Sequence, residues 1–385
     1  WSPASRSRVR LHDAAAITFR QKFVLAAKKA VSWPIANRTG VNALSSIERF
    51  SSHLLKTTDE YLNLMKKLQP SLVFNGSHVH SRVATQAVQA AQWLKIPTAT
   101  FIFSWDNLTS QGCIMLPYDY FLVWNEHLKT QLLEMYRRIR PEQVFVTGTP
   151  QFDFHFRPEF HKTREEFCAE VGADPKRPVV FYTTGMANHM PGEPELVEEI
   201  ADILRETGGA TTPQLLVRVY PKDLTDRFEP LKKSRPDILF QRTVWEKSWL
   251  TPKYEDSFGL INALRHCALG INIASTVSLE LCMFDKPVIN VGYNPQSVPV
   301  KEHRFADFYE FDHYRPLVKS GAVEVAENAR QMRDMIENYL NRPEHRRNER
   351  REIIDRMFGS TLDGKSAQRV AETLLKLAGR KGAIA

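Results

Sequence analysis

Polar side chains follow five short apolar segments of the sequence, each of which predicts a buried β-strand. Ligands of open parallel sheets bind outside the carboxyl ends of the strands, so these five clusters are the candidate sites. Their hydroxyls, carboxylates, amides and cations can bind anions or move a proton. The clusters begin at Asn75, Ser104, Thr183, Arg218 and Ala274.

The cluster after residues 269–273 is the most informative. Ser275, Thr276 and Ser278 open a predicted helix, where hydroxyls and backbone N–H groups meet the positive end of the helix dipole and favour a phosphate. Glu280 lies one turn beyond Thr276 on the same side, where its carboxylate can accept both hydroxyls of a ribose. The alternative is a capping box, in which Glu280 bonds the backbone at the helix start.

A second predicted anion site follows residues 178–182. Thr184 and Gly185 supply a hydroxyl and backbone N–H groups at a helix start, which suits a diphosphate. His189 in the same loop can bond phosphate or act as an acid, although a loop histidine is often simply solvated.

Arg218 and Lys222 bring two cations to the end of residues 214–219. Fixed cations there would stabilise the charge of a departing nucleotide diphosphate. The alternative is a surface salt-bridge cluster with Asp223 and Asp226, and this segment alone does not decide between them.

The clusters of the first half suggest an acceptor site. Trp105 can stack on a sugar face, and Asp106 can take a proton from an attacking hydroxyl. Asp106 or Asn107 capping a turn is the alternative, but the gathering of polar residues favours function. Asn75 and Ser77 also allow close approach of a ligand, although an ordinary strand-to-helix turn explains them somewhat better.

The elements that must position these residues repeat one pattern twice. Strands alternate with helices, which indicates parallel sheets, and residues 148–150 break the pattern. A chain of 385 residues suits two domains. We therefore predict the α/β class, with two doubly wound Rossmann-like domains, residues 1–150 and 151–385, that face a central cleft. Residues 13–68 predict helices on the outside of a sheet.

Composition narrows the protein class. The hydrophobic content of 43% and the charged content of 25% are typical of globular proteins. No apolar run reaches the roughly 18 residues of a membrane-spanning helix. A net charge of +8 favours anionic partners, yet no nucleic-acid module or zinc spacing is found. We expect no nucleic-acid partner and no metal.

The termini and cysteines bear on location. Residues 1–10 lack an initiator Met and a signal-peptide pattern, which predicts a start that is truncated or trimmed. The basic, amphipathic residues 20–29 favour a solvated helix face over a membrane surface, and peripheral contact with an anionic membrane stays open. The cysteines form no CxxC pair, which predicts a reducing, cytoplasmic compartment. They are Cys113, Cys168, Cys267 and Cys282.

Residues 178–385 resemble the donor-binding half of GT-B glycosyltransferases. The likeness extends to their relatives, the CDP-glycerol glycerophosphotransferases and the non-hydrolysing UDP-N-acetylglucosamine 2-epimerases. It rests on a helix that opens with small hydroxyl residues and carries Glu280, followed by the strand Lys-Pro-Val-Ile at 286–289. Residues 363–369 are similar to the closing helix of the same group, and Tyr220 stands where the phosphotransferases have histidine.

The resemblance implies a metal-independent glycosyltransferase. It would move a sugar from a nucleotide-activated donor, held by the second domain, to a hydroxyl of a glycan or lipid-linked acceptor near Asp106; no cofactor beyond this substrate is implied. Tyr220 weakens the phosphotransferase alternative, and the paired acidic and histidine segments of the epimerases are not found at matching positions. A non-catalytic sugar-nucleotide-binding protein and a binder of acidic polymers are competing interpretations.

Overall fold

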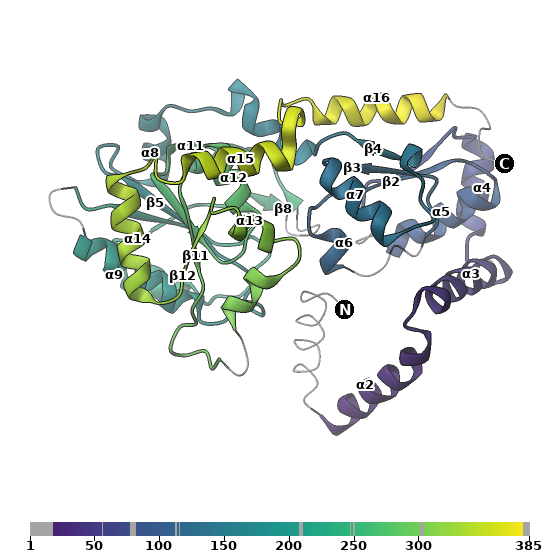
Figure 1. Cartoon of the computed structure of the whole chain (residues 1–385), viewed down its shortest axis with the longest axis horizontal. Coiled ribbons are helices and arrows are strands. Elements are labelled where there is room, and N and C mark those ends of the chain that lie inside the picture. The colour runs from purple at the N-terminus through teal and green to yellow at the C-terminus, as the bar shows by residue number, and fades with distance from the viewer. Residues whose placement is uncertain are drawn as a thin grey trace. The chain divides into compact units, whose positions relative to one another are not determined.

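The computed structural model describes residues 18–55, 57–77, 82–111, 114, 116–207, 211–246, 248, 251–300 and 304–379. It divides into two units, Trp1–Asp153 with Ser360–Ala385, and Phe154–Gly359 (Figure 1). The predictions for residues 1–10 and for Cys113 lie outside the described residues.

The first unit is built on a parallel four-stranded sheet of order β1-β2-β3-β4. The strands are β1 (Val73–Asn75), β2 (Thr98–Phe101), β3 (Tyr120–Val123) and β4 (Val144–Val146). The helices of its central part are α4 (Asp59–Leu68), α5 (Arg82–Trp93), α6 (Asn107–Ser110) and α7 (Glu126–Met135), with the 3-10 turn η2 (Pro141–Gln143). Because β3 is buried along its whole length, it reads as a continuous apolar run in the sequence, whereas the equally buried β2 includes Thr98 and Thr100.

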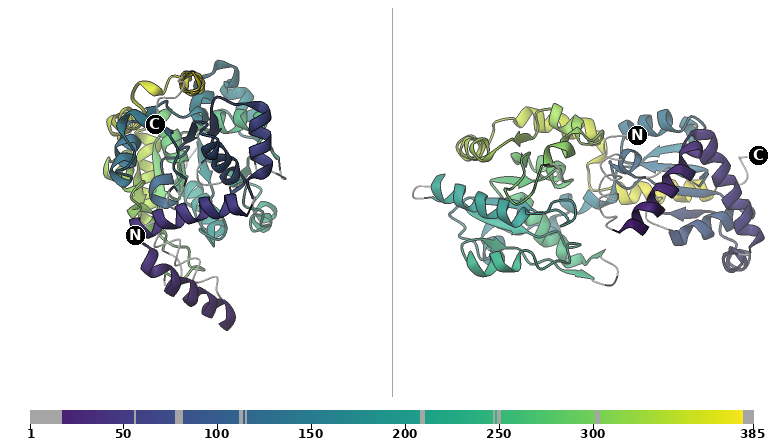
Figure 2. Two further views of the ribbon diagram at one scale, coloured as in Figure 1. Left: turned by 90° about the vertical axis from the view of Figure 1, so that its right-hand side faces the viewer. Right: turned by 90° about the horizontal axis from the view of Figure 1, so that it is seen from below.

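The N-terminal helices are α2 (Phe19–Ser32), η1 (Trp33–Ile35) and α3 (Arg38–Leu54). The predicted helices therefore form, and α4 packs on α5, with Met65 buried beside Ala90 and Ala91. The prediction that these helices cover a sheet is wrong for α2, which contains no buried residue. Both views of Figure 2 show α2 in purple.

The second unit contains a parallel six-stranded sheet of order β12-β11-β10-β5-β6-β7. In that order the strands are Glu324–Ala326, Val288–Val291, Leu269–Asn272, Val179–Thr183, Gln214–Arg218 and Leu239–Phe240. A separate antiparallel pair joins β8 (Trp245–Glu246) to β9 (Thr251–Pro252). The sequence predicts helix from Val325 onward, which is wrong for β12, because three residues at a sheet edge carry little periodic signal.

Helices cover both faces of the six-stranded sheet (Figure 1). On one face, α9 (Glu193–Thr207) packs with α14 (Ala329–Asn341), and on the other lie α8 (Arg164–Val171), α11 (Tyr254–His266), α12 (Val277–Met283) and α15 (Arg347–Phe358). The core between strands and helices includes Tyr182, Val217 and Ile271. Shorter elements are α10 (Glu229–Ser234), α13 (Arg315–Lys319), η3 (Pro150–Phe156), η4 (Pro158–Phe160), η5 (Phe305–Glu310) and η6 (Gly359–Thr361).

The C-terminal helix α16 (Ser366–Ala378) belongs to the first unit. The carboxylate of Asp153 accepts the N–H of Ser366 at 3.0 Å. Arg369 donates from Nε to the carbonyl of Thr147 at 2.8 Å, just after β4. The predicted second domain, 151–385, is therefore wrong in its last part, since contacts so distant in sequence leave no local pattern.

Candidate functional site

Three of the five predicted clusters lie along one edge of the second unit's sheet. Strand β10 pairs with β5, and β5 pairs with β6, all in parallel. The register places Asn272 opposite Thr183, and Thr183 opposite Arg218. The carboxyl ends of these strands are therefore neighbours. The remaining two clusters follow β1 and β2, which are neighbours in the first unit.

Arg218 at the end of β6 is held by a buried ion pair. Its side chain is only 7% exposed, and Nη2 lies 2.5 Å from Oδ2 of Asp256. Nη1 donates to Gln241 at 3.1 Å, while Trp245 Nε1 donates to the same Asp256 carboxylate at 2.8 Å. Burial lowers the pKa of Arg218, and the charge of Asp256 opposes that effect. The partner of Arg218 is therefore neither of the two aspartates expected for a surface salt-bridge cluster.

Lys222 has a different environment from Arg218. It is exposed on the loop after β6, and its neighbour Asp223 pairs with Arg227 at 2.7 Å. Tyr220 donates its backbone N–H to the hydroxyl of Thr184 at 2.8 Å. Thr184 thus ties the ends of β5 and β6 together, and of the two predicted cations Lys222 is the exposed one.

The loop that begins at Gly185 is fixed by Glu193, the first residue of α9. This carboxylate is 0% exposed and accepts the Gly185 N–H at 3.0 Å and the Tyr182 hydroxyl at 3.1 Å. Arg227 donates to it at 2.9 Å and to the Gly185 carbonyl at 2.8 Å. Burial raises the pKa of Glu193 to about 7, against the opposing charge of Arg227. His189 lies half-buried further along this loop.

Glu280 does not form the capping box. The helix start at Thr276 has no side-chain cap. Glu280, 7% exposed, instead lies with Oε2 at 2.8 Å from Nε2 of His155, whose ring stacks on Phe284. The charge of Glu280 also acts on Arg218, so the two groups are near each other.

Ser278 cannot bind a donor in the predicted way. It is 0% exposed, and its hydroxyl donates to Asn272 at 3.0 Å and accepts from Tyr314 at 2.8 Å. Its hydroxyl is used inside the core, so Ser278 does not belong to the site. Ser275 is half-buried, and its hydroxyl accepts the N–H of Val277 at 3.2 Å in the turn that opens α12.

In the first unit, Asp106 is held by hydroxyls rather than by cations. Its carboxylate accepts from Ser104 and from Ser110, and its side chain is half-buried. Asn107 is buried and accepts the Ser104 N–H at 3.2 Å. Trp105 is also buried, which counts against the predicted stacking on a sugar.

Asn75 and Ser77 follow the turn interpretation. The side chain of Asn75 is buried, donates to the Tyr118 hydroxyl at 2.7 Å and accepts the Ser77 N–H at 3.2 Å. Both contacts shape the turn after β1, so they explain these residues without a ligand.

Sequence reasoning missed Glu193 and His155 and did not foresee the role of Asp256. Each acts through a partner from another element, such as Asp256 on Arg218. The one local signal is an acidic residue beside a predicted helix start, which is common at ordinary helices. Among the described residues no group of three or more His, Cys, Asp or Glu side chains could hold a metal ion. No helix in that part of the chain has the length and apolar character needed to cross a bilayer.

Comparison with solved structures identifies the fold. The UDP-GlcNAc 2-epimerase from Methanocaldococcus jannaschii matches with a TM-score of 0.52 and 17% identity, over 83% of this chain and 81% of that chain. The enzyme from Neisseria meningitidis bound to UDP-GlcNAc matches with a TM-score of 0.54 and 14% identity, over 83% and 80%. The fold is of the GT-B type. The predicted pair of Rossmann-like domains is thus confirmed. No family model and no curated protein matches the chain.

Proposed function

We propose that this chain is an enzyme that acts on a nucleotide sugar and transfers the sugar to an acceptor hydroxyl. The observation that supports it most is the parallel pairing of β10, β5 and β6, which brings the three clusters predicted to bind a donor to one edge of the sheet. Nucleotide ligands bind at this edge in open α/β sheets. The solved structure from Neisseria meningitidis contains UDP-GlcNAc on the same fold.

The donor would be held by residues of the second unit. Oε2 of Glu280 contacts Nε2 of His155. Oε1 would accept a ribose hydroxyl of the donor. The hydroxyls of Ser275 and Thr276 would bind the diphosphate. The predicted contribution of the Gly185 backbone is not part of the proposal, because the carboxylate of Glu193 accepts its N–H. Tyr220 and His189 border this donor site in the proposal.

The chemistry would be a displacement at the anomeric carbon. The acceptor oxygen forms a bond to that carbon while the bond from the carbon to the diphosphate oxygen breaks. Asp106 takes the acceptor proton, and Lys222 stabilises the departing diphosphate. Arg218 is held in a buried ion pair with Asp256, so in this proposal it positions the end of β6 and does not contact the diphosphate. The proposal requires no metal, and a glycan or lipid-linked acceptor is its second substrate.

A sugar-nucleotide 2-epimerase is the second candidate. It is favoured by the two solved epimerases that share the fold along about four fifths of their chains. An epimerase inverts one carbon of the sugar and retains the bond to the diphosphate, so the two candidates differ in what they release. A binding protein without turnover would give neither product.

The test has two stages. Thermal shifts with UDP, GDP, CDP and CMP identify the nucleotide, and the matching sugar nucleotides are then incubated with and without glycan and lipid-linked acceptors. Release of nucleotide that depends on an acceptor supports the transferase, whereas a new sugar epimer without release supports the epimerase. Stabilisation without either product indicates a binder. Absence of any shift, with salt-sensitive binding to acidic polymers instead, would overturn the proposal.

A further inference from the structure

The N-terminal helices α2 and α3 present large apolar side chains to solvent. Phe19 is 85% exposed and Trp33 is 83% exposed. The apolar residues Ile47, Phe50 and Leu54 of α3 are exposed as well. In the part of the chain that the structure describes, α2 has no buried residue, so its apolar side chains do not serve a core.

These apolar residues form a stripe with basic borders. At 100° per residue, Phe19, Phe23, Ala26 and Ala30 of α2 fall on one side of the helix. Lys22 and Lys29 fall together on one border of the stripe, and Arg20 falls on the other. An apolar stripe between basic borders is typical of helices that lie in the plane of a membrane interface.

The positive charge of residues 14–47 favours an anionic partner. Residues 14–47 contain five basic residues and no Asp or Glu, the basic ones being Arg20, Lys22, Lys28, Lys29 and Arg38. A second copy of the chain on this stripe would bring like charges together, which is unfavourable. An anionic lipid surface takes up both the apolar stripe and the positive charge. The exposed Trp33 suits the same boundary, where indole rings are enriched.

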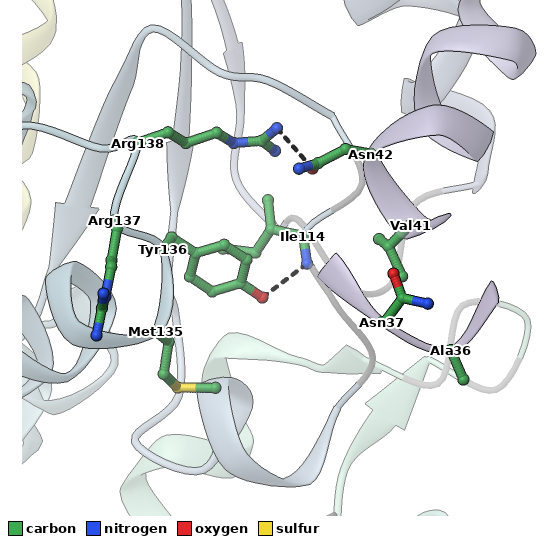
Figure 3. Close-up of a pocket in the computed structure, with 9 residues that line it drawn as sticks. All are labelled: Ala36, Asn37, Val41, Asn42, Ile114, Met135, Tyr136, Arg137 and Arg138. Atoms are coloured by element: carbon green, nitrogen blue, oxygen red, sulfur yellow. Dashed lines mark hydrogen bonds between the residues drawn. The ribbon is translucent and has the colours of Figure 1, made fainter. Parts of the chain in front are cut away.

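A pocket lies where these helices join the body of their unit. It has a volume of about 570 Å³ and is bordered by Val41, Ile114 and Met135 together with Arg137 and Arg138 (Figure 3). Both arginines are exposed. The pocket therefore adds apolar and basic side chains at the start of α3 and just beyond α7.

Arg138 also joins α3 to the wall of this pocket. Its Nη1 donates to Oδ1 of Asn42 at 3.0 Å, as the dashed line in Figure 3 shows. Tyr136 accepts the N–H of Ile114 at 3.0 Å through its hydroxyl on the same wall. One side-chain hydrogen bond thus connects α3 to the segment after α7, while α2, which precedes α3, carries the exposed stripe.

We propose that α2 and the start of α3 dock this chain on an anionic lipid surface. The stripe of Phe19 and Phe23 enters the interface between headgroups and acyl chains, and Lys22 and Lys29 contact the anionic headgroups. Arg137 and Arg138 add positive charge at the pocket. The inference goes beyond the proposed enzyme activity and does not depend on it.

The experiment measures binding of the full chain to vesicles. Vesicles of phosphatidylcholine alone are compared with vesicles that contain about one third phosphatidylglycerol, at low and high salt. We expect at least about tenfold tighter binding to the anionic vesicles, and loss of most of that difference in K22E/K29E. The variant F19S/F23S should bind anionic vesicles at least about tenfold more weakly, because its stripe no longer enters the interface.

The matched control reverses two exposed lysines of the second unit, Lys233 and Lys319. K233E/K319E has the same net charge as K22E/K29E and should bind anionic vesicles like the unchanged chain. Equal loss in both variants would overturn the proposal, since it would show a response to net charge alone. Equal binding of neutral and anionic vesicles, or a dimer that F19S/F23S abolishes without any vesicle binding, would overturn it too. Thermal melting checks that each variant is folded.

Discussion

Charged residues at the strand ends have different partners in the two units. In the second unit, Arg218 pairs with Asp256 and Glu193 pairs with Arg227, all largely buried. In the first unit, the carboxylate of Asp106 accepts hydrogen bonds from two hydroxyls and stays partly exposed. A buried pair fixes a loop or strand end, whereas a partly exposed carboxylate can be reached by a substrate. The difference predicts stability effects for the buried pairs of the second unit and a rate effect for Asp106.

The largest effect is expected from Arg218→Ala. It leaves the carboxylate of Asp256 buried without its ion-pair partner, so the free energy of unfolding should fall by about 3 to 5 kcal/mol. Denaturant titration measures this loss. The sequence alone predicts that turnover suffers more than stability. A stable R218A protein with reduced turnover would show that Arg218 acts on the reaction, and would contradict the structural role assigned to the buried pairs of the second unit.

Glu193 should make stability depend on pH. Its pKa is raised by burial to about 7, so the folded state binds the proton more tightly than the unfolded state does. The stability from this proton is present below about pH 4.5 and is lost as the pH rises to about 7, by an amount on the order of 3 kcal/mol. Unfolding of the unchanged chain and of Glu193→Gln between pH 5 and 8 measures it. Parallel pH profiles would show that Glu193 stays ionised throughout.

Asp106→Asn tests the first unit. The amide keeps the size. Its oxygen can accept one of the Ser104 and Ser110 hydroxyls and its NH2 group can donate to the other. It cannot take a proton, so turnover should fall by about a hundredfold or more while donor binding survives. Initial rates and nucleotide titration separate the two quantities. Full activity would remove Asp106 from the mechanism. A large loss of thermal stability would instead make it a structural residue like those of the second unit.

Glu280→Ala should weaken nucleotide binding by about 1.5 to 3 kcal/mol, because a charge-assisted hydrogen bond from a ribose hydroxyl to Oε1 is lost. Titration calorimetry with the nucleoside diphosphate measures the change. His155→Gln is the matched control, since it removes the imidazole that contacts Glu280 and retains the carboxylate. Unchanged affinity in E280A together with reduced stability would assign Glu280 a structural pairing with His155 only.

Lys222→Ala should have the smallest effect. Lys222 is exposed, so its removal should change the free energy of unfolding by no more than about 0.5 kcal/mol. Turnover should fall by about tenfold, because a cation that contacts the leaving diphosphate acts on the transition state. Lys222→Arg keeps the charge and should recover most of the rate. Unchanged turnover in K222A would remove Lys222 from the mechanism.

The sequence by itself determined the alternation of strands and helices and the ends of the strands where a site belongs. Strands buried on both faces, such as β5, read as apolar runs, and polar residues mark their ends. It also determined the donor-half motif, since the helix with Glu280 and the strand β11 that follows it are local features.

Only the tertiary structure decided what each polar residue bonds. Asp256 reaches Arg218 across 38 positions of the chain, His155 reaches Glu280 across 125, and Arg369 of α16 reaches Thr147 across 222. Periodicity reports whether a residue faces a core, and it carries no information on which distant side chain lies opposite. Ser278 shows the consequence, because its place in the sequence suggested a ligand and the fold buried it against Tyr314.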